Sequence, residues 1–438
     1  MVEIAKLLFC NSTNSVWKKI SSTSKDFNIS NFPESIDPLS VKLFAIVFTG
    51  NDIENCNFDI RYQIMDANKS TFMISGKYDY NFGQLDLEFY LENLETTTLN
   101  KGTIFSLGWR TDQIIHFMLI GDVDSYIGPY IDGWSWMRDY RNILGNYPIS
   151  KLCIPGSHDA GMSVMTSSTT FVRECNTLTQ SNDIFEQLRF GIRYFDIRPV
   201  LKDGNFFTGH YREILFVWEG ANGESIDSMI SSINYFTRMN SELVIIRLDH
   251  SLDLDVGFWE KDHPFYQEQW DNLFKKLSQI NNLYFHDNNR KILDLTFDEL
   301  TDNGTHSAVL IFVENKKTNV DLQEYHNKGF YYLNELNMYH KYSNKNTVFQ
   351  MASDQFAKME KYSPTHYFEL SWILTQDIEQ IATCSYSIRD LGDIANDELV
   401  YDVYPRITKK AYPNIILIDN VKDQIAATLC VAINWWLK

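Results

Sequence analysis

The sequence of 438 residues contains few cysteines and no long hydrophobic run. Its six cysteines are scattered, and none belongs to a C-x-x-C pair, so we expect reduced thiols and neither a disulfide scaffold nor a zinc site. No apolar stretch approaches the roughly 18 residues of a membrane-spanning helix. The N-terminal segment has an acid at position 3 and only a brief apolar run, which makes it a poor secretory signal. These absences predict a protein that is cytoplasmic or is exported without a cleaved signal peptide.

Basic charge is also scarce, because 39 Lys and Arg residues face 57 Asp and Glu residues and leave a net charge of −18. An acidic surface argues against general affinity for nucleic acid or anionic lipid headgroups, although a local basic pocket remains compatible with it. The sequence also lacks a Walker loop and the G-x-G-x-x-G, G-x-S-x-G and H-E-x-x-H motifs. We therefore expect no nucleic-acid partner, while the composition leaves the oligomeric state open.

Residues 1–122 have the texture of an all-β domain. Short segments alternate in hydrophobicity, are rich in aromatic and β-branched residues, and are separated by Asn, Asp and Gly. They span residues 41–50, 57–66, 70–80, 85–94 and 114–122. Regularly spaced short strands of this kind predict a sandwich-like domain, for which the sequence indicates no role.

Residues 123–148 form an aromatic-rich junction. Such rings are found at membrane interfaces, and they also fill ordinary packing between domains, which is the interpretation we favour for this cluster. Its members are Tyr126, Tyr130, Trp134 and Trp136. Transient contact with a membrane surface is more plausible for aromatic residues farther along the chain, at Phe206, Phe207 and residues 216–218.

Residues 149–438 alternate between buried-strand and amphipathic-helix patterns. Continuous apolar runs typical of parallel strands cover residues 151–156, 192–200, 242–251, 307–315, 369–376 and 414–421. Between them lie amphipathic segments such as 223–240, where apolar residues recur at helical spacing. This alternation predicts an α/β fold, a TIM-like (β/α) barrel that is regular, distorted or incompletely closed.

Polar residues recur where these apolar runs end. In (β/α) barrels the active site lies at the C-terminal ends of the strands. Two histidines suit proton transfer to and from a phosphate ester, and an arginine suits binding of phosphate oxygens. Each residue alone is more often structural, but their repetition at successive strand ends predicts phosphoryl chemistry. The candidates are His158, Asp159, Asp196, Arg198, His210, Asp249, Asp377 and Asp419.

Three segments resemble the X domain of phosphatidylinositol-specific phospholipases C, in the small bacterial and fungal form. They are "LCIPGSHDAGM" at 152–162, "FEQLRFGIRYFDIRPV" at 185–200, and the Gly-His pair at 209–210. The resemblance covers roughly residues 145–438 and implies cleavage of a phospholipid or related phosphodiester. It implies that His158 is the general base oriented by Asp419 and that His210 is the general acid. Arg198 would bind the phosphate, Asp159 would bridge to His210, and Asp196 would support the site.

The resemblance also bears on metals and on the headgroup. Calcium-dependent members carry a carboxylate where this chain has Arg198, so we expect no metal and no other cofactor. Basic residues that help bind inositol in the bacterial enzymes are not evident, and Asp249 and Glu314 are among the residues in that region. Asp377 is a candidate for a ring-binding aspartate. The alternative is a non-catalytic module that binds lipid, glycan or protein.

Overall fold

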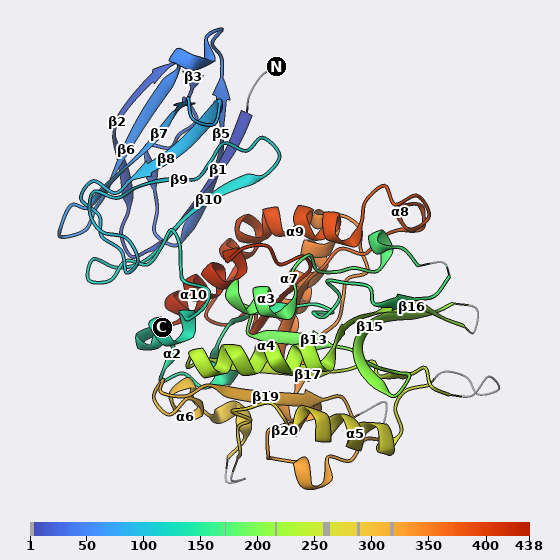
Figure 1. The fold of residues 1–438 in the computed structure, drawn as a ribbon. Coiled ribbons are helices and arrows are strands. Elements are labelled where there is room, and N and C mark those ends of the chain that lie inside the picture. The colour runs from blue at the N-terminus through green and yellow to red at the C-terminus, as the bar shows by residue number, and fades with distance from the viewer. Residues whose placement is uncertain (1–3, 171, 215–216, 257–262, 287–289, 316–318) are drawn as a thin grey trace. The chain divides into compact units, whose positions relative to one another are not determined.

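The computed structural model describes residues 4–170, 172–214, 217–256, 263–286, 290–315 and 319–438. The chain divides into two compact units (Figure 1). Unit 1 comprises Met1–Ile131, Asp397–Ile407 and Val431–Lys438, and unit 2 comprises Asp132–Asn396 and Thr408–Cys430. Within the described ranges, no helix has the length and apolar character needed to cross a lipid bilayer.

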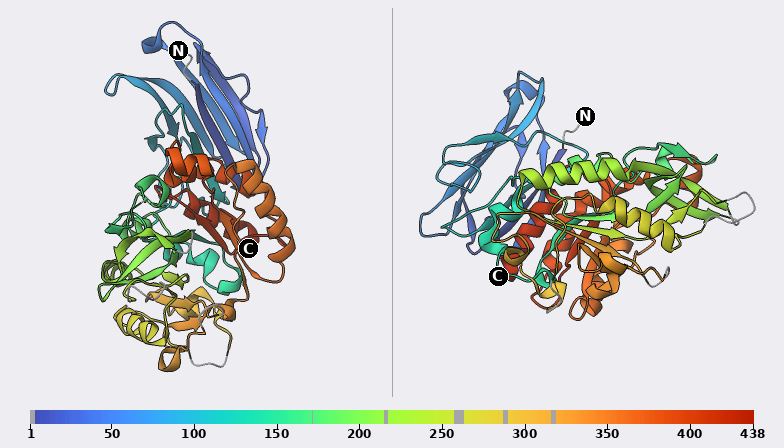
Figure 2. Two further views of the ribbon diagram at one scale, coloured as in Figure 1. Left: turned by 90° about the vertical axis from the view of Figure 1, so that its right-hand side faces the viewer. Right: turned by 60° about the horizontal axis from the view of Figure 1, so that its bottom comes forward.

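Unit 1 contains two β-sheets, one of four and one of six strands (Figure 2). The four-stranded sheet has the order β10 (Ile114–Gly121), β1 (Ile4–Thr13), β5 (Ser40–Phe48), β3 (Phe27–Asn28). The six-stranded sheet has the order β4 (Ser35–Ile36), β2 (Trp17–Lys25), β6 (Asn57–Ile64), β7 (Thr71–Asp79), β8 (Gln84–Tyr90), β9 (Ile104–Ser106). All described pairings are antiparallel except β1 with β10, which is parallel.

The core of unit 1 is aromatic. Phe9 makes edge-to-face contacts with Trp17, Tyr62 and Phe72, among other rings. In β6 every second residue is buried, from Phe58 to Ile64, which is the alternation that predicts these strands. The sequence did not reveal β1, because its residues from Leu7 onward are buried without alternation.

Unit 2 contains an eight-stranded sheet in which all pairs are parallel. Its order is β20 (Phe330–Tyr332), β19 (Ala308–Val313), β17 (Leu243–Leu248), β13 (Tyr194–Ile197), β11 (Ile154–Ser157), β23 (Ile415–Ile418), β22 (Tyr367–Trp372), β21 (Met338–Tyr339). The last strand along the chain, β23, pairs with the first, β11. Since no ladder joins β20 to β21 in the described residues, the sheet is a parallel half-barrel, in line with the predicted incompletely closed barrel.

The helices of the described residues do not follow every strand of this sheet, as they would in a regular barrel. They are α1 (Trp136–Asp139), α2 (Arg141–Leu144), α3 (Ile184–Arg189), α4 (Ile226–Met239), α5 (Gln267–Leu277), α6 (Phe297–Leu300), α7 (Val348–Tyr362), α8 (Ile378–Thr383), α9 (Ile388–Val403) and α10 (Ile425–Leu437). Among the described residues, only 3-10 turns lie between β19 and β20 and between β20 and β21. The predicted apolar face of α4 is buried, and the Ser225 side chain caps its first turn.

A second, five-stranded sheet follows β13 and carries part of the candidate site. Its order is β12 (Ser167–Ser168), β16 (Val217–Ser225), β15 (Asn205–Ile214), β14 (Pro199–Lys202), β18 (Leu252–Asp253). Arg198 lies between β13 and β14, and His210 lies on β15. The chain therefore brings both residues to the side of the half-barrel where β13 ends.

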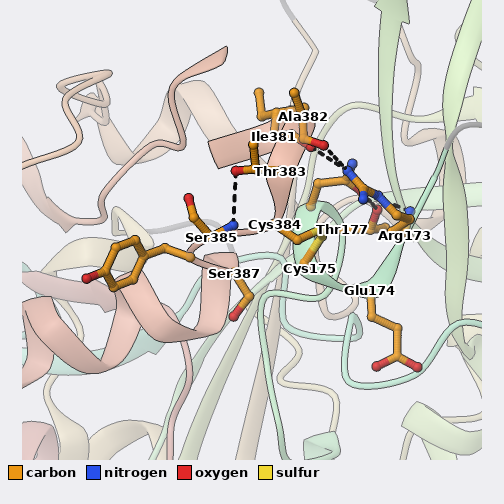
Figure 3. The surroundings of a disulfide bond; sticks show 12 residues. Arg173, Glu174, Cys175, Thr177, Ile381, Ala382, Thr383, Cys384, Ser385 and Ser387 are labelled. Carbon is orange, nitrogen blue, oxygen red and sulfur yellow. Dashed lines mark hydrogen bonds between the residues drawn. A yellow bond between two sulfur atoms is a disulfide. The ribbon is translucent and has the colours of Figure 1, made fainter. Parts of the chain in front are cut away.

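The expectation that all cysteines are reduced is wrong for one pair. Cys175 and Cys384 form a disulfide with their Cα atoms 5.8 Å apart (Figure 3). The two residues are separated by 209 positions, so no local spacing motif could reveal the bond. The other four cysteines are buried and form no disulfide in the structure.

The aromatic residues of the junction mostly serve packing. Tyr126 belongs to the core of unit 1. In unit 2, Trp136 is buried, and Trp134 makes edge-to-face contacts with Phe185 and Phe236. Tyr130 is 43% exposed.

Of the residues predicted to touch a membrane, Phe206 is buried against Phe265, and Phe207 is partly buried. Phe216 lies outside the described residues. Membrane contact therefore remains a prediction.

Candidate active site

His158 follows β11 directly and is held on both ring nitrogens. The register of β11 with β23 brings Asp419 beside it, and the His158 backbone N–H donates to the Ile418 carbonyl at 3.0 Å. Nδ1 lies 2.8 Å from Asp419 Oδ1, and Nε2 lies 2.7 Å from Arg198 Nη2. A guanidinium only donates, so Nε2 accepts and the ring proton resides on Nδ1. The contact between His158 and Asp419 predicted from the sequence is confirmed.

The environment of His158 makes it a stronger base than a free imidazole. Burial, the largest influence, lowers the pKa of His158, but the charge of Asp419 and its hydrogen bond outweigh burial. The pKa of His158 therefore lies above its ordinary value, even though the Arg198 charge opposes this shift.

Arg198 stands between two buried carboxylates. Its Nη1 lies 3.2 Å from Asp159 Oδ2, and its Nη2 lies 3.6 Å from Asp196 Oδ2. Burial lowers the pKa of Arg198, but the two carboxylates outweigh this effect and raise it, so the group stays cationic. Asp159 adopts a left-handed backbone conformation with φ of 43°, which places its carboxylate next to the arginine rather than along the strand.

His210 is the second histidine of the site. Its Nδ1 lies 2.8 Å from the Thr177 carbonyl, which can only accept, so Nδ1 carries a proton and Nε2 is the nitrogen left to exchange a proton with a bound molecule. Asp159 Oδ2 lies 3.8 Å from the same Nδ1. Burial lowers the pKa of His210, and the Arg198 charge adds to this effect against the opposing charge of Asp159.

Beneath these residues lies an ion-pair network that the sequence did not predict. Arg247 on β17 is 1% exposed and contacts Asp196 at 3.1 Å, Glu369 at 3.0 Å and Asp249 at 3.6 Å. Burial would raise the pKa of Asp196, but the Arg247 and Arg198 charges hold it well below its usual range. Arg247 and Glu369 each interrupt an apolar run, "LVIIRL" and "YFELSW". A charge inside a strand buried on both faces was the available signal, since such a charge needs a partner.

Tyr342 is another residue that sequence reasoning missed. Its ring meets the His158 ring edge-to-face at 5.3 Å between centroids. Its hydroxyl oxygen is buried without a hydrogen-bond partner among the described residues, and burial raises its pKa. It follows β21, a strand of two residues that left no pattern in the sequence. The hydroxyl is therefore a donor available to a molecule bound beside His158.

The predicted substrate-binding residues have different outcomes. Asp196 lies within the site, in contact with Arg198. Asp377 does not join the cluster, because its exposed carboxylate accepts hydrogen bonds from the Gln380 backbone N–H at 2.9 Å and from Asn346 Nδ2 at 2.8 Å. It caps α8. This role needs only a polar side chain before a helix, and the sequence alone did not distinguish it from ligand binding.

Asp249 lines a cavity of about 230 Å³ that also touches Arg198. In the described part of the chain, one group of three candidate metal ligands occurs, namely Asp249, Glu314 and His340, with ligand atoms within 4.8 Å of one another. Three donors fall short of the six to eight oxygen ligands that calcium usually takes. Metal independence remains a prediction.

The candidate residues thus form a continuous series. Asp419 contacts His158, His158 contacts Arg198, Arg198 contacts Asp159, and Asp159 lies near His210. A proton acceptor and a potential proton donor flank one permanent cation. That arrangement can bind an anionic phosphate and move protons on two sides of it.

No protein-family model matches the chain. Human PI-PLC X domain-containing protein 2 is 28% identical over 140 residues, which cover 27% of this chain and 44% of that protein. The mouse protein of the same name is 27% identical over 140 residues and 40% of its length. The chain resembles the PI-PLC X-domain family. It spans less than half the length of these curated relatives.

Solved structures of similar shape include two bacterial proteins. One is the phosphatidylinositol-specific phospholipase C of Listeria monocytogenes, with a TM-score of 0.48, 17% identity, and coverage of 69% of this chain and 99% of that one. The other is a variant of the phosphatidylinositol-specific phospholipase C of Staphylococcus aureus, with a TM-score of 0.47, 15% identity, and coverage of 68% and 97%.

Proposed function

We propose that this PI-PLC X-domain-like chain is a phosphodiesterase that cleaves a phospholipid or related phosphodiester. The observation that carries the proposal is the series from Asp419 through His158 and Arg198 to Asp159, with His210 beside it. These side chains can accept a proton, bind a phosphate and donate a proton, which are the tasks that phosphoryl transfer requires, and they lie in one site.

In the proposed mechanism Arg198 binds the phosphate oxygens and stabilises the charge that builds up as phosphorus is attacked. Asp419 holds the proton on Nδ1 of His158, so once the Arg198 Nη2 turns from His158 to the phosphate, the Nε2 lone pair accepts the proton of the attacking hydroxyl. A bond forms from that hydroxyl oxygen to phosphorus, and the bond to the leaving oxygen breaks. His210 gives a proton to the leaving oxygen from Nε2.

We propose that the nucleophile is a hydroxyl of the substrate next to the phosphate, so the first product is a cyclic phosphodiester. A substrate without such a hydroxyl should be poor, and its efficient turnover would indicate water as the nucleophile. We also propose that no metal takes part, because the Arg198 guanidinium already supplies the positive charge between Asp159 and Asp196.

The substrate class implies that the protein meets lipid aggregates at least transiently. The second candidate function is a module that binds a lipid, glycan or protein without turnover. The observation that supports this alternative is the cavity beside Arg198, whose lining includes the carboxylates of Asp249 and Glu314.

The experiment is a kinetic comparison of His158→Ala, His210→Ala and Asp377→Asn on a panel of phosphodiesters. Each histidine variant should lose about two to four orders of magnitude in rate, the usual contribution of one acid or base group. Asp377→Asn should keep full activity, because Asn caps a helix as well as Asp. Losses below about tenfold at both histidines would exclude this mechanism. Binding of a lipid with no turnover would favour the binding module.

A further inference from the structure

The cavity beside Arg198 has an unusual lining for a site next to a phosphate. It lies within unit 2 and is formed where β13, β17 and β19 end, together with β15 and β16. Arg198 contributes the one guanidinium of its described lining. Asp249 and Glu314 contribute carboxylates, and Tyr211, Trp218 and Trp270 contribute aromatic rings. Arg198 can therefore bind an anion at one side of the cavity. The carboxylates and aromatic rings of the remaining lining suit a group that is not anionic.

In the described lining of this cavity, two carboxylates, Asp249 and Glu314, lie with one guanidinium, Arg198, and one imidazole, His250. Arg247, 3.6 Å from Asp249, is shared with Asp196 and Glu369, and the His250 Nδ1 lies 3.3 Å from the Asp249 Oδ1. Arg198 is likewise shared between Asp159 and Asp196. A phosphate bound at Arg198 would add further negative charge next to Asp249 and Glu314, which are 3% and 8% exposed. A cavity lined by carboxylates beside a bound phosphate suits a cationic group better than an anionic one.

We infer that the cavity holds an ammonium group carried by the headgroup, so the substrates are phosphodiesters of amino alcohols such as ethanolamine or choline. The inference rests on the phosphodiesterase function proposed above. Carboxylates attract the cation, and Trp218 and Tyr211 line the same cavity, where aromatic rings can contribute to binding of an ammonium group, methylated or not. Asp249 and Glu314 thereby become residues that determine specificity.

This headgroup is compatible with the proposed nucleophile if the attacking hydroxyl belongs to the glycerol. In a lysophospholipid the free hydroxyl at glycerol C2 lies next to the phosphate. It loses its proton to His158 and bonds to phosphorus, while the bond to the amino alcohol breaks and that oxygen takes a proton from His210. The products are a cyclic glycerophosphate lipid and the free amino alcohol. A diacyl lipid offers no such hydroxyl.

The test with turnover uses lysophosphatidylcholine, lysophosphatidylethanolamine, lysophosphatidylglycerol and lysophosphatidylinositol in the presence of EDTA. All four carry the glycerol hydroxyl, and only the first two carry an ammonium group. We expect kcat/KM to be at least about tenfold higher for those two. Glu314→Gln should remove most of this preference, while Asp377→Asn, which also deletes one carboxylate but lies on α8, should retain it. Equal or better turnover of the glycerol and inositol lipids would overturn the inference and leave the phosphodiesterase function standing.

A binding measurement separates failure of the inference from failure of catalysis. Calorimetric titration of the full chain with phosphocholine and with glycerol 3-phosphate, both in EDTA, compares two phosphates with and without an ammonium group. Tighter binding of phosphocholine in wild type but not in Glu314→Gln would support the inference even if no diester is cleaved. No preference for phosphocholine would overturn it. Binding of Mn²⁺ or Ca²⁺ to the chain without EDTA that is lost in Glu314→Gln, together with no preference for phosphocholine in EDTA, would also overturn it and assign Asp249, Glu314 and His340 to a metal.

Discussion

At the scale of single residues, His158 is the group whose protonation the surroundings control most tightly. Asp419 favours the protonated ring, whereas burial and the Arg198 charge favour the neutral ring. Because the net pKa is raised, the fold gains stability from protonated His158 below its unfolded pKa of about 6.5. That stability is lost as the pH rises through the folded pKa.

Replacing Asp419 with Asn should therefore lower the pKa of His158, since the two largest influences that raise it, a charge and a hydrogen bond, both come from Asp419. Proton NMR titration of the His158 ring in wild type and Asp419→Asn measures this directly. The variant should also fold normally and lose much of kcat with little change in KM, because an amide orients the ring without supplying charge. An unchanged His158 pKa together with an unchanged kcat would show that Asp419 does not orient or charge-stabilise the His158 ring.

Arg198 leads to a prediction about metals. Its guanidinium lies 3.2 Å from Asp159 and 3.6 Å from Asp196, where it would repel a divalent cation bound by the same carboxylates. Activity should therefore survive EDTA, and Arg198→Asp should stay inactive when calcium is added. Inactivation by EDTA that calcium reverses would contradict the metal-independent mechanism.

The sequence predicted the candidate site residues that lie at strand ends. It did not predict the site residues inside strands or after very short strands. His158 and Asp419 could be paired from the sequence because the last barrel strand lies beside the first. Arg247 and Glu369 could not be paired from the sequence, because an ion pair between two buried strands depends on which strands face each other. Tyr342 follows a two-residue strand with no recognisable pattern.

At the scale of elements, the Cys175–Cys384 disulfide ties the 3-10 turn Glu174–Asn176, which follows β12, to the end of α8 (Figure 3). Nearby hydrogen bonds reinforce this connection, from Arg173 to the carbonyls of Ile381 and Ala382 at 2.8 Å each. Two residues beyond Cys175, the Thr177 carbonyl accepts the hydrogen bond of His210. The disulfide thus restrains the loop that orients the candidate acid.

Replacing both Cys175 and Cys384 with Ser should lower the free energy of unfolding by about 2–5 kcal/mol, because the bond closes a long loop in the unfolded chain. Guanidinium denaturation with and without a dithiol reductant measures the effect. Reductant should destabilise wild type and leave the double variant unchanged, which serves as the control. Equal stability of reduced and unreduced wild type would argue against the bond.

Elements with a clear period were predictable, and short or fully buried ones were not. The alternation in β6 and the helical spacing in α4 follow from one buried and one exposed face. In contrast, β20 and β21 have three and two residues, and β1 is buried without alternation. The sequence therefore indicated the parallel sheet and the sandwich but not where the sheet stays open.

At the scale of the whole molecule, unit 1 is assembled from segments far apart in the chain. Residues 397–407 and 431–438 belong to it together with the N-terminal strands. Within unit 1 the Tyr404 hydroxyl donates to Ser12 Oγ at 2.7 Å, and Asp397 accepts from the Ile114 backbone N–H at 2.6 Å. The N-terminal β-strands therefore share unit 1 with two segments from the C-terminal part of the chain.

A chain of residues 132–438 should consequently be less stable than the full chain, because it would expose Tyr404 and Ile407, which are 4% and 7% exposed in the complete protein. Soluble yield and thermal unfolding of the two chains provide the comparison. A cooperative transition of the shortened chain at the temperature of the full chain would contradict this account.

The most direct test of the proposed function is phosphorus NMR of the reaction products. The full chain is incubated in EDTA with phosphatidylinositol and with the four lysophospholipids named above. The account predicts that at least one substrate signal is replaced by that of a cyclic phosphodiester, and that His158→Ala abolishes this change. Spectra that stay unchanged for every lipid, or a product signal that forms equally well with His158→Ala, would contradict it.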